Sequence, residues 1–252
     1  MRLLVTRAEP DAIKLRAALE RLGHEATVEP LLSVAYVDGA PIELDGVQAL
    51  IATSRNALKA LRNHPARREA VGLPLFAVGK ATAEEARALG FATVITGAGN
   101  AQELMQHIVS VVDPAAGLLM HLAGDRLAAD LKGDLEAQGF RVVEVVVYRT
   151  NAAKSLSEDA VEQIWMGEIE GVILLSPHTA AVYASLIKKH GLSEYVKGLT
   201  HFCLSQAVAR RLEPLGGVGV EVAAEPSLRQ VLASIVERAG GPRTVAHDED
   251  EA

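Results

Sequence analysis

The chain contains the same pattern twice, and this internal repeat limits its possible folds more than any other feature. The related blocks are 3–25 with 119–141, 52–61 with 174–186, and 76–90 with 202–216. Within them Leu19 aligns with Leu135, and Ser54 aligns with Ser176. Since three separate blocks agree in order, we expect two similar lobes built from a duplicated half.

Short apolar runs alternate with amphipathic stretches along both halves. The strand-like runs are 3–6, 49–53, 75–78, 93–96, 118–123, 172–176, 202–205 and 220–223. A stretch with near-helical spacing of apolar side chains follows each run, as residues 10–22 follow the first. Strands that alternate with helices of this length predict an α/β fold in which each lobe is a parallel sheet flanked by helices.

Two longer β-rich runs, 26–38 and 141–151, are not followed at once by a helix. We interpret each run as one long strand that crosses between the lobes, so that the two form a two-stranded β linker. The order of the repeated blocks then makes one lobe discontinuous. The predicted parts are a discontinuous lobe (1–35 plus 151–242), a continuous lobe (40–146) and a disordered acidic tail (243–252).

Composition excludes several classes of protein. The formal charge is −7 and the positive charges are dispersed, which disfavours nucleic acid as a partner. A single cysteine, Cys203, lies in an apolar run and is expected in the core, which fits a reducing compartment. No stretch approaches the roughly 20 apolar residues of a membrane span, and the first residues lack a signal-peptide core. We therefore expect a soluble cytoplasmic protein.

Ser, Thr or Gly follows nearly every predicted strand, immediately before the next helix. Ligands of open parallel sheets bind beyond the carboxyl ends of the strands. Each such residue alone is explained as a helix N-cap, worth about 1 kcal/mol. Together, several helix N-termini around one cleft between the lobes would bind carboxylates or phosphates. The cations or histidines nearby are Arg7, Arg55, Lys80, Arg126, Arg149 and His178. The pattern therefore predicts a polyanionic small-molecule ligand.

Motifs for other chemistries are absent from the sequence. There is no GxGxxG, no GxxxxGK[ST] and no GxSxG. No His or Cys cluster has the spacing of metal ligands, and Asp125 lacks a partner carboxylate of the glycosidase kind. The eight histidines are scattered, and we expect each to be a surface residue or one with satisfied hydrogen bonds. Covalent and metal catalysis are therefore disfavoured.

Several blocks together resemble the uroporphyrinogen-III synthase family. They are LLVTRAEPDA, LIATSRNALKAL, FAVGKATAEEARALGF, HLAGDRLAADLKGDLEAQGF, VVVYRT, ILLSPHTAAVY, CLSQAVARRL and AAEPSLRQVLASI. They cover the chain to about residue 240 in the family's order and spacing. One departure is that the usual Thr-Arg-Pro opening is here Thr6-Arg7-Ala8-Glu9-Pro10.

The resemblance implies a lyase of haem and porphyrin biosynthesis without a metal or organic cofactor. Its substrate is hydroxymethylbilane, a linear tetrapyrrole with eight carboxylates, which loses water and closes with inversion of ring D. The resemblance implies that Tyr148 assists departure of the hydroxyl; the alternative is a linker residue packed by its ring. The substrate-binding residues carried over are Thr6, Arg7, Ser54, Lys80, Thr82, Gly124, Ser176, His178, Ser205 and Gln206.

Two other functions remain open at this point. A non-catalytic hinged two-lobe binding protein for an anionic small molecule would show the same double crossing, although such receptors are usually exported. A two-lobed glycosyltransferase-like enzyme would usually carry a nucleotide-binding signature, which is not found. No association surface is evident in the sequence, so we expect a monomer.

Overall fold

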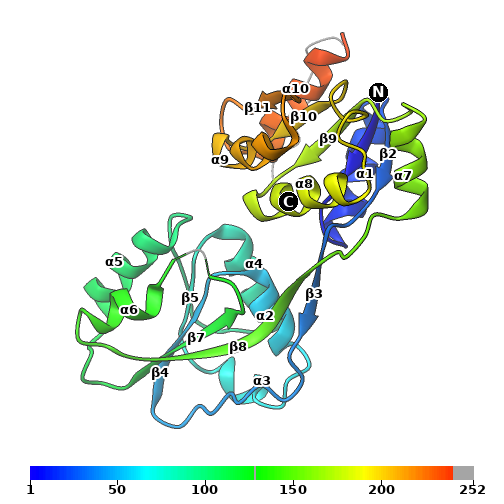
Figure 1. Ribbon diagram of the computed structural model, residues 1–252. Helices are drawn as coiled ribbons and strands as arrows, with labels where there is room; N and C mark the ends of the chain where they lie inside the picture. The colour runs from blue at the N-terminus through cyan, green and yellow to red at the C-terminus, as the bar shows by residue number, and fades with distance from the viewer. Residues whose placement is uncertain (128, 241–252) are drawn as a thin grey trace. The chain divides into compact units, whose positions relative to one another are not determined.

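The computed structural model describes residues 1–127 and 129–240 of the chain. The chain divides into two compact units (Figure 1). Of the described residues, unit 1 contains Met1–Ser33 and 151–240, and unit 2 contains Val34–Thr150. The acidic tail predicted at 243–252 lies outside the described residues.

Unit 1 is built on a five-stranded sheet in the order β11-β10-β9-β1-β2. Its strands are β1 (Arg2–Val5), β2 (Glu25–Val28), β9 (Gly171–Leu174), β10 (Thr200–Cys203) and β11 (Gly219–Val222). All neighbouring pairs are parallel. Strands β9 and β10 are buried along their whole length, as expected of central strands whose two faces are both covered.

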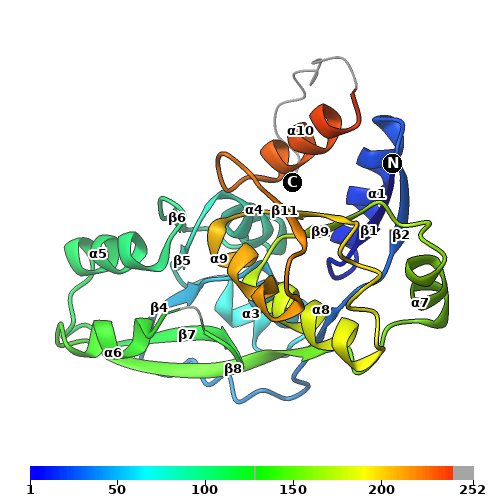
Figure 2. The same ribbon diagram turned by 45° about the horizontal axis from the view of Figure 1, so that its top comes forward.

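Helices cover both faces of the unit 1 sheet (Figures 1 and 2). Because successive side chains of a strand point to opposite faces, Leu3 and Val5 pack on one side and Leu4 on the other. The first side is covered by α1 (Asp11–Arg21) and α10 (Leu228–Arg238). The second side is covered by α7 (Glu158–Trp165), α8 (Pro177–Lys189), α9 (Gln206–Ala209) and the 3₁₀ helix η1 (Arg210–Leu215).

Unit 2 is built on a six-stranded sheet in the order β3-β8-β7-β4-β5-β6. Its strands are β3 (Leu32–Tyr36), β4 (Val47–Ala52), β5 (Leu75–Ala77), β6 (Val94–Thr96), β7 (Leu118–Gly124) and β8 (Arg141–Ala152). The pairs from β8 to β6 are parallel. One face packs against α2 (Arg55–Leu61), α3 (Arg67–Ala70) and α4 (Lys80–Leu89), and the other against α5 (Ala101–Val111) and α6 (Leu131–Glu136). The predicted α/β class, with parallel sheets flanked by helices, is confirmed.

The two sheets share one topology. Unit 1 runs β11-β10-β9-β1-β2, and the parallel part of unit 2 runs β6-β5-β4-β7-β8. The repeated sequence blocks place β1 on β7, β9 on β4 and β10 on β5, which are equivalent positions in the two sheets. Unit 2 comes from one continuous segment, whereas β1 and β2 of unit 1 precede it in the chain.

One prediction about the connecting segments is wrong. Residues 26–38 were expected to form one long strand, but β2 ends at Val28 in the unit 1 sheet and β3 begins at Leu32 in the unit 2 sheet. The break comes where the partner strand ends: the Glu29 and Leu31 N–H groups still donate to the Val5 and Thr6 carbonyls at the end of β1, and from Leu32 the chain pairs in the other sheet. The second segment is one continuous strand, β8, and it pairs with β3.

Candidate functional site

The carboxyl ends of three neighbouring strands bring the predicted polar residues of unit 1 together. Thr6 and Arg7 follow β1, Ser176 follows β9, and Ser205 follows β10. Leu174 of β9 lies opposite Cys203 of β10, so Ser176 and Ser205 each stand two residues beyond a paired position. Neighbouring strands lie about 4.8 Å apart, which places these residues along one sheet edge.

The two serines of this edge differ in what their hydroxyls do. Ser176 caps α8: its Oγ accepts a hydrogen bond from the Thr179 backbone N–H at 3.1 Å and lies 2.8 Å from Thr179 Oγ1. Ser205 precedes α9, but its side chain makes no capping bond. The first-turn N–H groups of α9 are therefore not satisfied by a side-chain cap. His178 and Gln206 lie in the first turns of the same helices.

Thr6 and Arg7 already have partners within unit 1. The buried Thr6 hydroxyl donates to the Ile173 carbonyl at 2.7 Å and thus extends the contact of β1 with β9 beyond the strand. Arg7 Nη2 pairs with Asp11 Oδ2 at 2.7 Å, in the first turn of α1. A guanidinium has five N–H donors, so this ion pair does not use up the hydrogen-bonding capacity of Arg7.

Unit 2 has an equivalent edge at the ends of β4, β5 and β7. Ser54 caps α2 by accepting from the Asn56 N–H at 3.2 Å. Lys80 begins α4 after Gly79, and its side chain is exposed, whereas Thr82 in the same turn is buried. The helices that begin at this edge direct their N-terminal N–H groups toward it, a favourable setting for anions.

Gly124 and Tyr148 form a close pair at this edge. They are register partners on β7 and β8, next to an irregularity between Ala123 and Gly124. A Cβ added at Gly124 would lie 2.5 Å from Tyr148 Cζ and 2.7 Å from its Oη, so the ring occupies the space that a side chain would need. The Asp125 N–H donates to the Tyr148 carbonyl at 3.1 Å and fixes the two strands there. The tyrosine hydroxyl is thereby held at the carboxyl edge.

A polar group next to this edge was not among the predicted site residues. His121 Nε2 lies 3.2 Å from Thr53 Oγ1, and His121 Nδ1 lies 3.1 Å from Glu144 Oε2. His121 is buried, which lowers its pKa, although the Glu144 carboxylate opposes this shift. The sequence signal is a single histidine within the apolar run LLMHLA. Each histidine was expected to be a surface residue or to have satisfied hydrogen bonds; His121 meets this expectation, whereas the buried Nε2 of His24 has no hydrogen-bond partner among the described residues.

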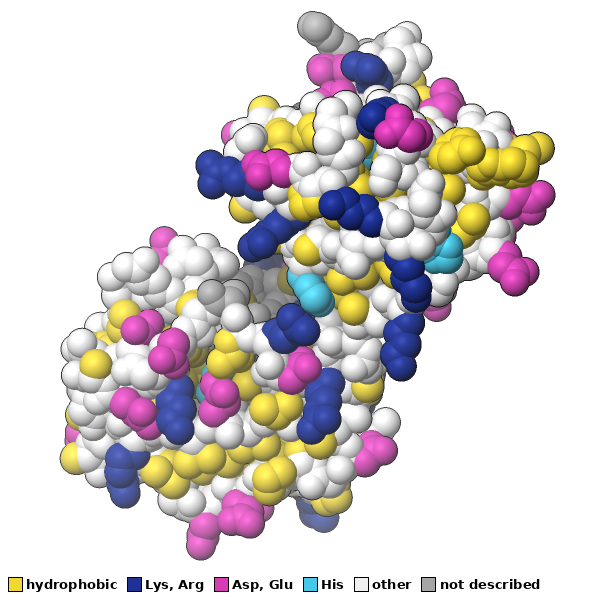
Figure 3. All heavy atoms as spheres, viewed as in Figure 1, with side chains coloured by type: hydrophobic (Ala, Val, Ile, Leu, Met, Phe, Trp, Pro, Cys, Tyr) yellow, Lys and Arg dark blue, Asp and Glu magenta, His cyan; other side chains and the backbone are white. Residues whose placement is uncertain are grey.

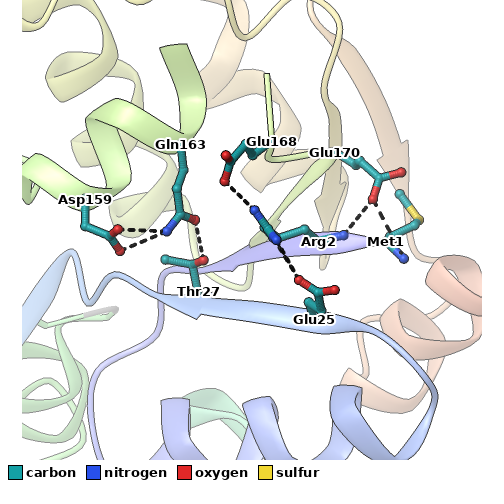
Figure 4. Close-up of polar contacts among 8 residues, drawn as sticks. All are labelled: Met1, Arg2, Glu25, Thr27, Asp159, Gln163, Glu168 and Glu170. Atoms are coloured by element: carbon teal, nitrogen blue, oxygen red, sulfur yellow. Dashed lines mark hydrogen bonds and ion pairs between the residues drawn. The ribbon is translucent and has the colours of Figure 1, made fainter. Parts of the chain in front are cut away.

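The amino end of the unit 1 sheet carries a different cluster (Figure 4). Arg2 pairs with Glu25 at 2.9 Å and also with Glu168, and its backbone N–H donates to Glu170 Oε2 at 2.7 Å. These are exposed ion pairs, which contribute little to stability. The charges of Arg2 and of the terminal ammonium of Met1 are met by these carboxylates, so the cluster offers no surplus positive charge to an anionic ligand.

The surface charge and the cavities were compared with the positions of the predicted site residues. On the face seen in Figure 3, Lys and Arg side chains are scattered among Asp and Glu. A cavity of about 550 Å³ lies beside Tyr36 and Arg62 in unit 2, and one of about 440 Å³ lies beside Arg2 in unit 1; neither is lined by a predicted site residue. Within the described ranges, no three His, Cys, Asp or Glu side chains are placed to hold a metal ion. No helix there has the length and apolar character of a membrane span.

The fold and the edge residues together define a class: a duplicated α/β protein whose candidate ligand-binding groups follow parallel strands in both units. Residues 13–233 match the family described as uroporphyrinogen-III synthase HemD. The chain belongs to the uroporphyrinogen-III synthase family, as the resemblance in the sequence indicated. This is a family of enzymes, cyclases of the lyase class, that serves porphyrin and haem biosynthesis.

Solved structures agree with this fold. The uroporphyrinogen-III synthetase of Helicobacter pylori is 17% identical, with a TM-score of 0.67 over 94% of this chain and 100% of that one. A mutant uroporphyrinogen III synthase of Thermus thermophilus is 15% identical, with a TM-score of 0.57 over 95% of this chain and 97% of that one. No curated protein sequence matches the chain.

Proposed function

We propose that this protein converts hydroxymethylbilane into uroporphyrinogen III by dehydrative cyclisation with inversion of ring D. The observation that carries the proposal is the family match over residues 13–233, most of the chain. The geometry supports it because both units present helix N-termini at the carboxyl edges of their sheets. Such termini suit a substrate whose eight side chains all end in carboxylates.

At the carboxyl edges of the two sheets, carboxylates would be bound by backbone N–H groups as much as by side chains. The hydroxyls of Ser54 and Ser176 cap their own helices, and that of Thr6 donates to a carbonyl. We propose that these three act through the N–H groups and backbone shape that they set. A carboxylate at one helix N-terminus gains about 0.3–1 kcal/mol, so several such contacts restrain the substrate.

Polar side chains at the two edges would add to the contacts made by backbone groups. We propose direct contacts from the other carried-over residues with polar side chains, namely Arg7, Lys80, Thr82, His178, Ser205 and Gln206. Gly124 is proposed to act through the space that it leaves for Tyr148. The support for these direct contacts is that each of the six residues follows a strand end directly or lies one helical turn beyond it.

The reaction needs selection between two closures more than it needs strong side-chain chemistry. Loss of the hydroxyl as water leaves an electrophilic azafulvene on ring A. Ring D attacks it from its already substituted carbon, and the spiro intermediate fragments and recloses with ring D inverted. Unaided, the chain closes without inversion. A hundredfold preference requires only about 2.7 kcal/mol, which conformational restraint can supply.

Tyr148 is proposed to donate a hydrogen bond or proton to the departing hydroxyl oxygen. Its support is the contact with Gly124, which holds the phenol at the carboxyl edge of unit 2. The alternative, a residue that only packs its ring, shares this contact and differs in leaving the hydroxyl without a role. Replacing the tyrosine by phenylalanine separates the two.

The proposed function is tested by supplying freshly made hydroxymethylbilane and identifying the uroporphyrinogen isomer formed. We expect the type III isomer above the enzyme-free control. If only the type I isomer appears at the control rate, the enzyme proposal is wrong. Saturable binding of hydroxymethylbilane without turnover would instead support a hinged binding protein.

We further propose that the protein works in the cytoplasm as a monomer, without nucleic acid or a membrane as partner. The supports are the net charge of −7 and a lone cysteine, which cannot form a disulfide within the chain. Sedimentation velocity over a range of concentrations tests the oligomeric state, and a species of twice the 26.7 kDa chain mass would contradict the monomer.

A further inference from the structure

Thr53, His121 and Glu144 form a row across three neighbouring strands of unit 2. His121 on β7 is the register partner of Ile51 on β4 and of Glu144 on β8. Thr53 follows β4 directly, two residues beyond Ile51, and therefore points to the same face of the sheet. His121, the middle member of the row, is buried, whereas Glu144 and Thr53, which lies at the carboxyl edge, are half-buried.

Unit 1 has apolar residues at the same three places. Strands β1, β2 and β9 of unit 1 are paired in the same register as β7, β8 and β4 of unit 2. Val5 therefore occupies the position equivalent to His121, and Val28 the position equivalent to Glu144. Leu175, which directly follows β9, occupies the position equivalent to Thr53. Val5, Val28 and Leu175 all pack in one apolar cluster of unit 1. The topology can therefore be built without polar groups here, and unit 2 carries them despite the cost of desolvation.

The chemistry of the three groups fixes the direction of their hydrogen bonds. An ionised carboxylate only accepts, so Glu144 takes the N–H of His121 Nδ1. In a neutral imidazole Nε2 then carries a lone pair, and the Thr53 hydroxyl donates its proton to it. Burial lowers the pKa of His121, which keeps the neutral form at neutral pH. The Thr53 oxygen is left as an acceptor at the sheet edge.

We propose that Thr53 contacts the substrate and that His121 and Glu144 are positioning residues that orient its hydroxyl. The inference rests on the proposed function, since it assigns Thr53 a partner on the linear tetrapyrrole. The carboxylates of that substrate accept hydrogen bonds, whereas its pyrrole N–H groups donate them. An oriented acceptor therefore recognises a pyrrole N–H, and it complements the helix N-termini that receive the carboxylates.

The test first identifies the uroporphyrinogen isomer that the unmodified protein forms. It then compares kcat/KM for formation of that isomer between the unmodified protein and its variants. Thr53→Val and His121→Val should each lower kcat/KM about tenfold, the equivalent of about 1.4 kcal/mol and of one hydrogen bond. The double variant should lose no more than either single variant, because His121 acts through Thr53. Thr53→Ser keeps the hydroxyl and should stay within about threefold of the unmodified protein.

A triple variant separates this role from a role in folding. Thr53→Val, His121→Val and Glu144→Val together give unit 2 an apolar set like that of unit 1. Replacing a buried polar group by apolar residues is often neutral or stabilising, so Tm should not fall while kcat/KM falls about tenfold. The control is Tyr183→Phe, which removes the buried bond from Tyr183 Oη to His201 Nε2 at 3.1 Å. It should lower Tm and leave kcat/KM unchanged.

The outcomes distinguish the two proposals. An unmodified protein that yields only the type I isomer contradicts the proposed function itself. If that protein yields type III but Thr53→Val stays within twofold of it, the inference about Thr53 is overturned. A double variant about a hundredfold slower than the unmodified protein would show that His121 acts independently of Thr53. Should His121→Val fail to fold, Thr53→Val compared with Thr53→Ser still decides whether the hydroxyl matters.

Discussion

Tyr148 occupies the space directly above the α-carbon of Gly124, so that a Cβ at Gly124 would come within 2.5 Å of the ring. The contact joins β7 to β8 at the sheet edge where the phenol is held. A glycine is required there because any side chain would displace the ring. The position of the proposed acid therefore depends on a residue that has no functional group of its own.

Gly124→Ala is expected to push the Tyr148 ring away and to lower both stability and activity. Overpacking of this kind costs about 1–3 kcal/mol, and a displaced phenol no longer meets the leaving oxygen. Thermal unfolding and kcat for type III formation measure the two effects. Gly198→Ala is the matched control, because a Cβ at Gly198 meets nothing within 4 Å. An unchanged kcat in Gly124→Ala would show that the contact between Gly124 and the Tyr148 ring is not needed for catalysis.

Tyr148→Phe keeps the ring and removes only the hydroxyl. If the hydroxyl assists departure of water, kcat for type III formation should fall at least tenfold, because general acids contribute about 10²–10⁴-fold. Tm should change little, since the ring still fills the space above Gly124. Tyr195→Phe, at an exposed tyrosine that accepts a bond from Trp165 Nε1, serves as the control. Activity of Tyr148→Phe within about twofold would exclude Tyr148 from the chemistry.

The strands were predictable because buried parallel strands form short continuous apolar runs. VILLS and FCLS, for example, correspond to β9 and β10, each of them fully buried. The repeat was also visible, because it fixes the order of blocks rather than any one residue. The segment 26–38 was predicted wrongly because its apolar pattern continues without interruption, whereas β2 ends where its partner strand β1 ends, a boundary that the segment's own pattern does not show.

The candidate site was less accessible to sequence reasoning because partners come from distant strands. Thr53 and His121 are 68 residues apart, and only the register of β4, β7 and β8 brings them together with Glu144. The hydroxyl of Thr6 meets the Ile173 carbonyl across 167 residues, which no local motif reveals. The site residues named from the sequence therefore stay predictions, now with observed surroundings.

Thr6→Val tests whether Thr6 acts through the fold or through the ligand. Its buried hydroxyl donates to the Ile173 carbonyl, so the variant should lose about 1 kcal/mol of stability. For a chain of this size that lowers Tm by about 2–4 °C. KM for hydroxymethylbilane should stay within twofold, whereas a raised KM at unchanged Tm would show that the hydroxyl binds substrate. Thr6→Ser, which keeps the hydroxyl, should restore most of the stability.

Cys203 is expected to be chemically inert in the native protein. The residue is buried in unit 1, and burial raises the pKa of its thiol to about 12. Since the thiolate is the reactive form, a disulfide reagent such as dithionitrobenzoate should label the native chain only at the rate of unfolding. In urea the single thiol should react fully. Rapid stoichiometric labelling in native buffer would contradict this account of the core.

Stability should fall as the solution is made acidic, because two buried histidines are held neutral. Burial lowers the pKa of His121 and of His201, whereas in the unfolded chain a histidine titrates near 6.5. Below about pH 6.5 the unfolded state therefore binds more protons than the native state, and stability decreases with falling pH until the native pKa is passed.

Each histidine contributes at most about 1.4 kcal/mol per pH unit to this loss, and above about pH 7.5 the contribution is constant. Urea unfolding at pH 7.5 and pH 5.5 measures the effect. The triple variant that replaces Thr53, His121 and Glu144 by valine should lose less stability between these pH values, by up to one histidine's share. An equal loss in the variant and the unmodified protein would mean that His121 takes up its proton without unfolding, and that the row tolerates a charged imidazole.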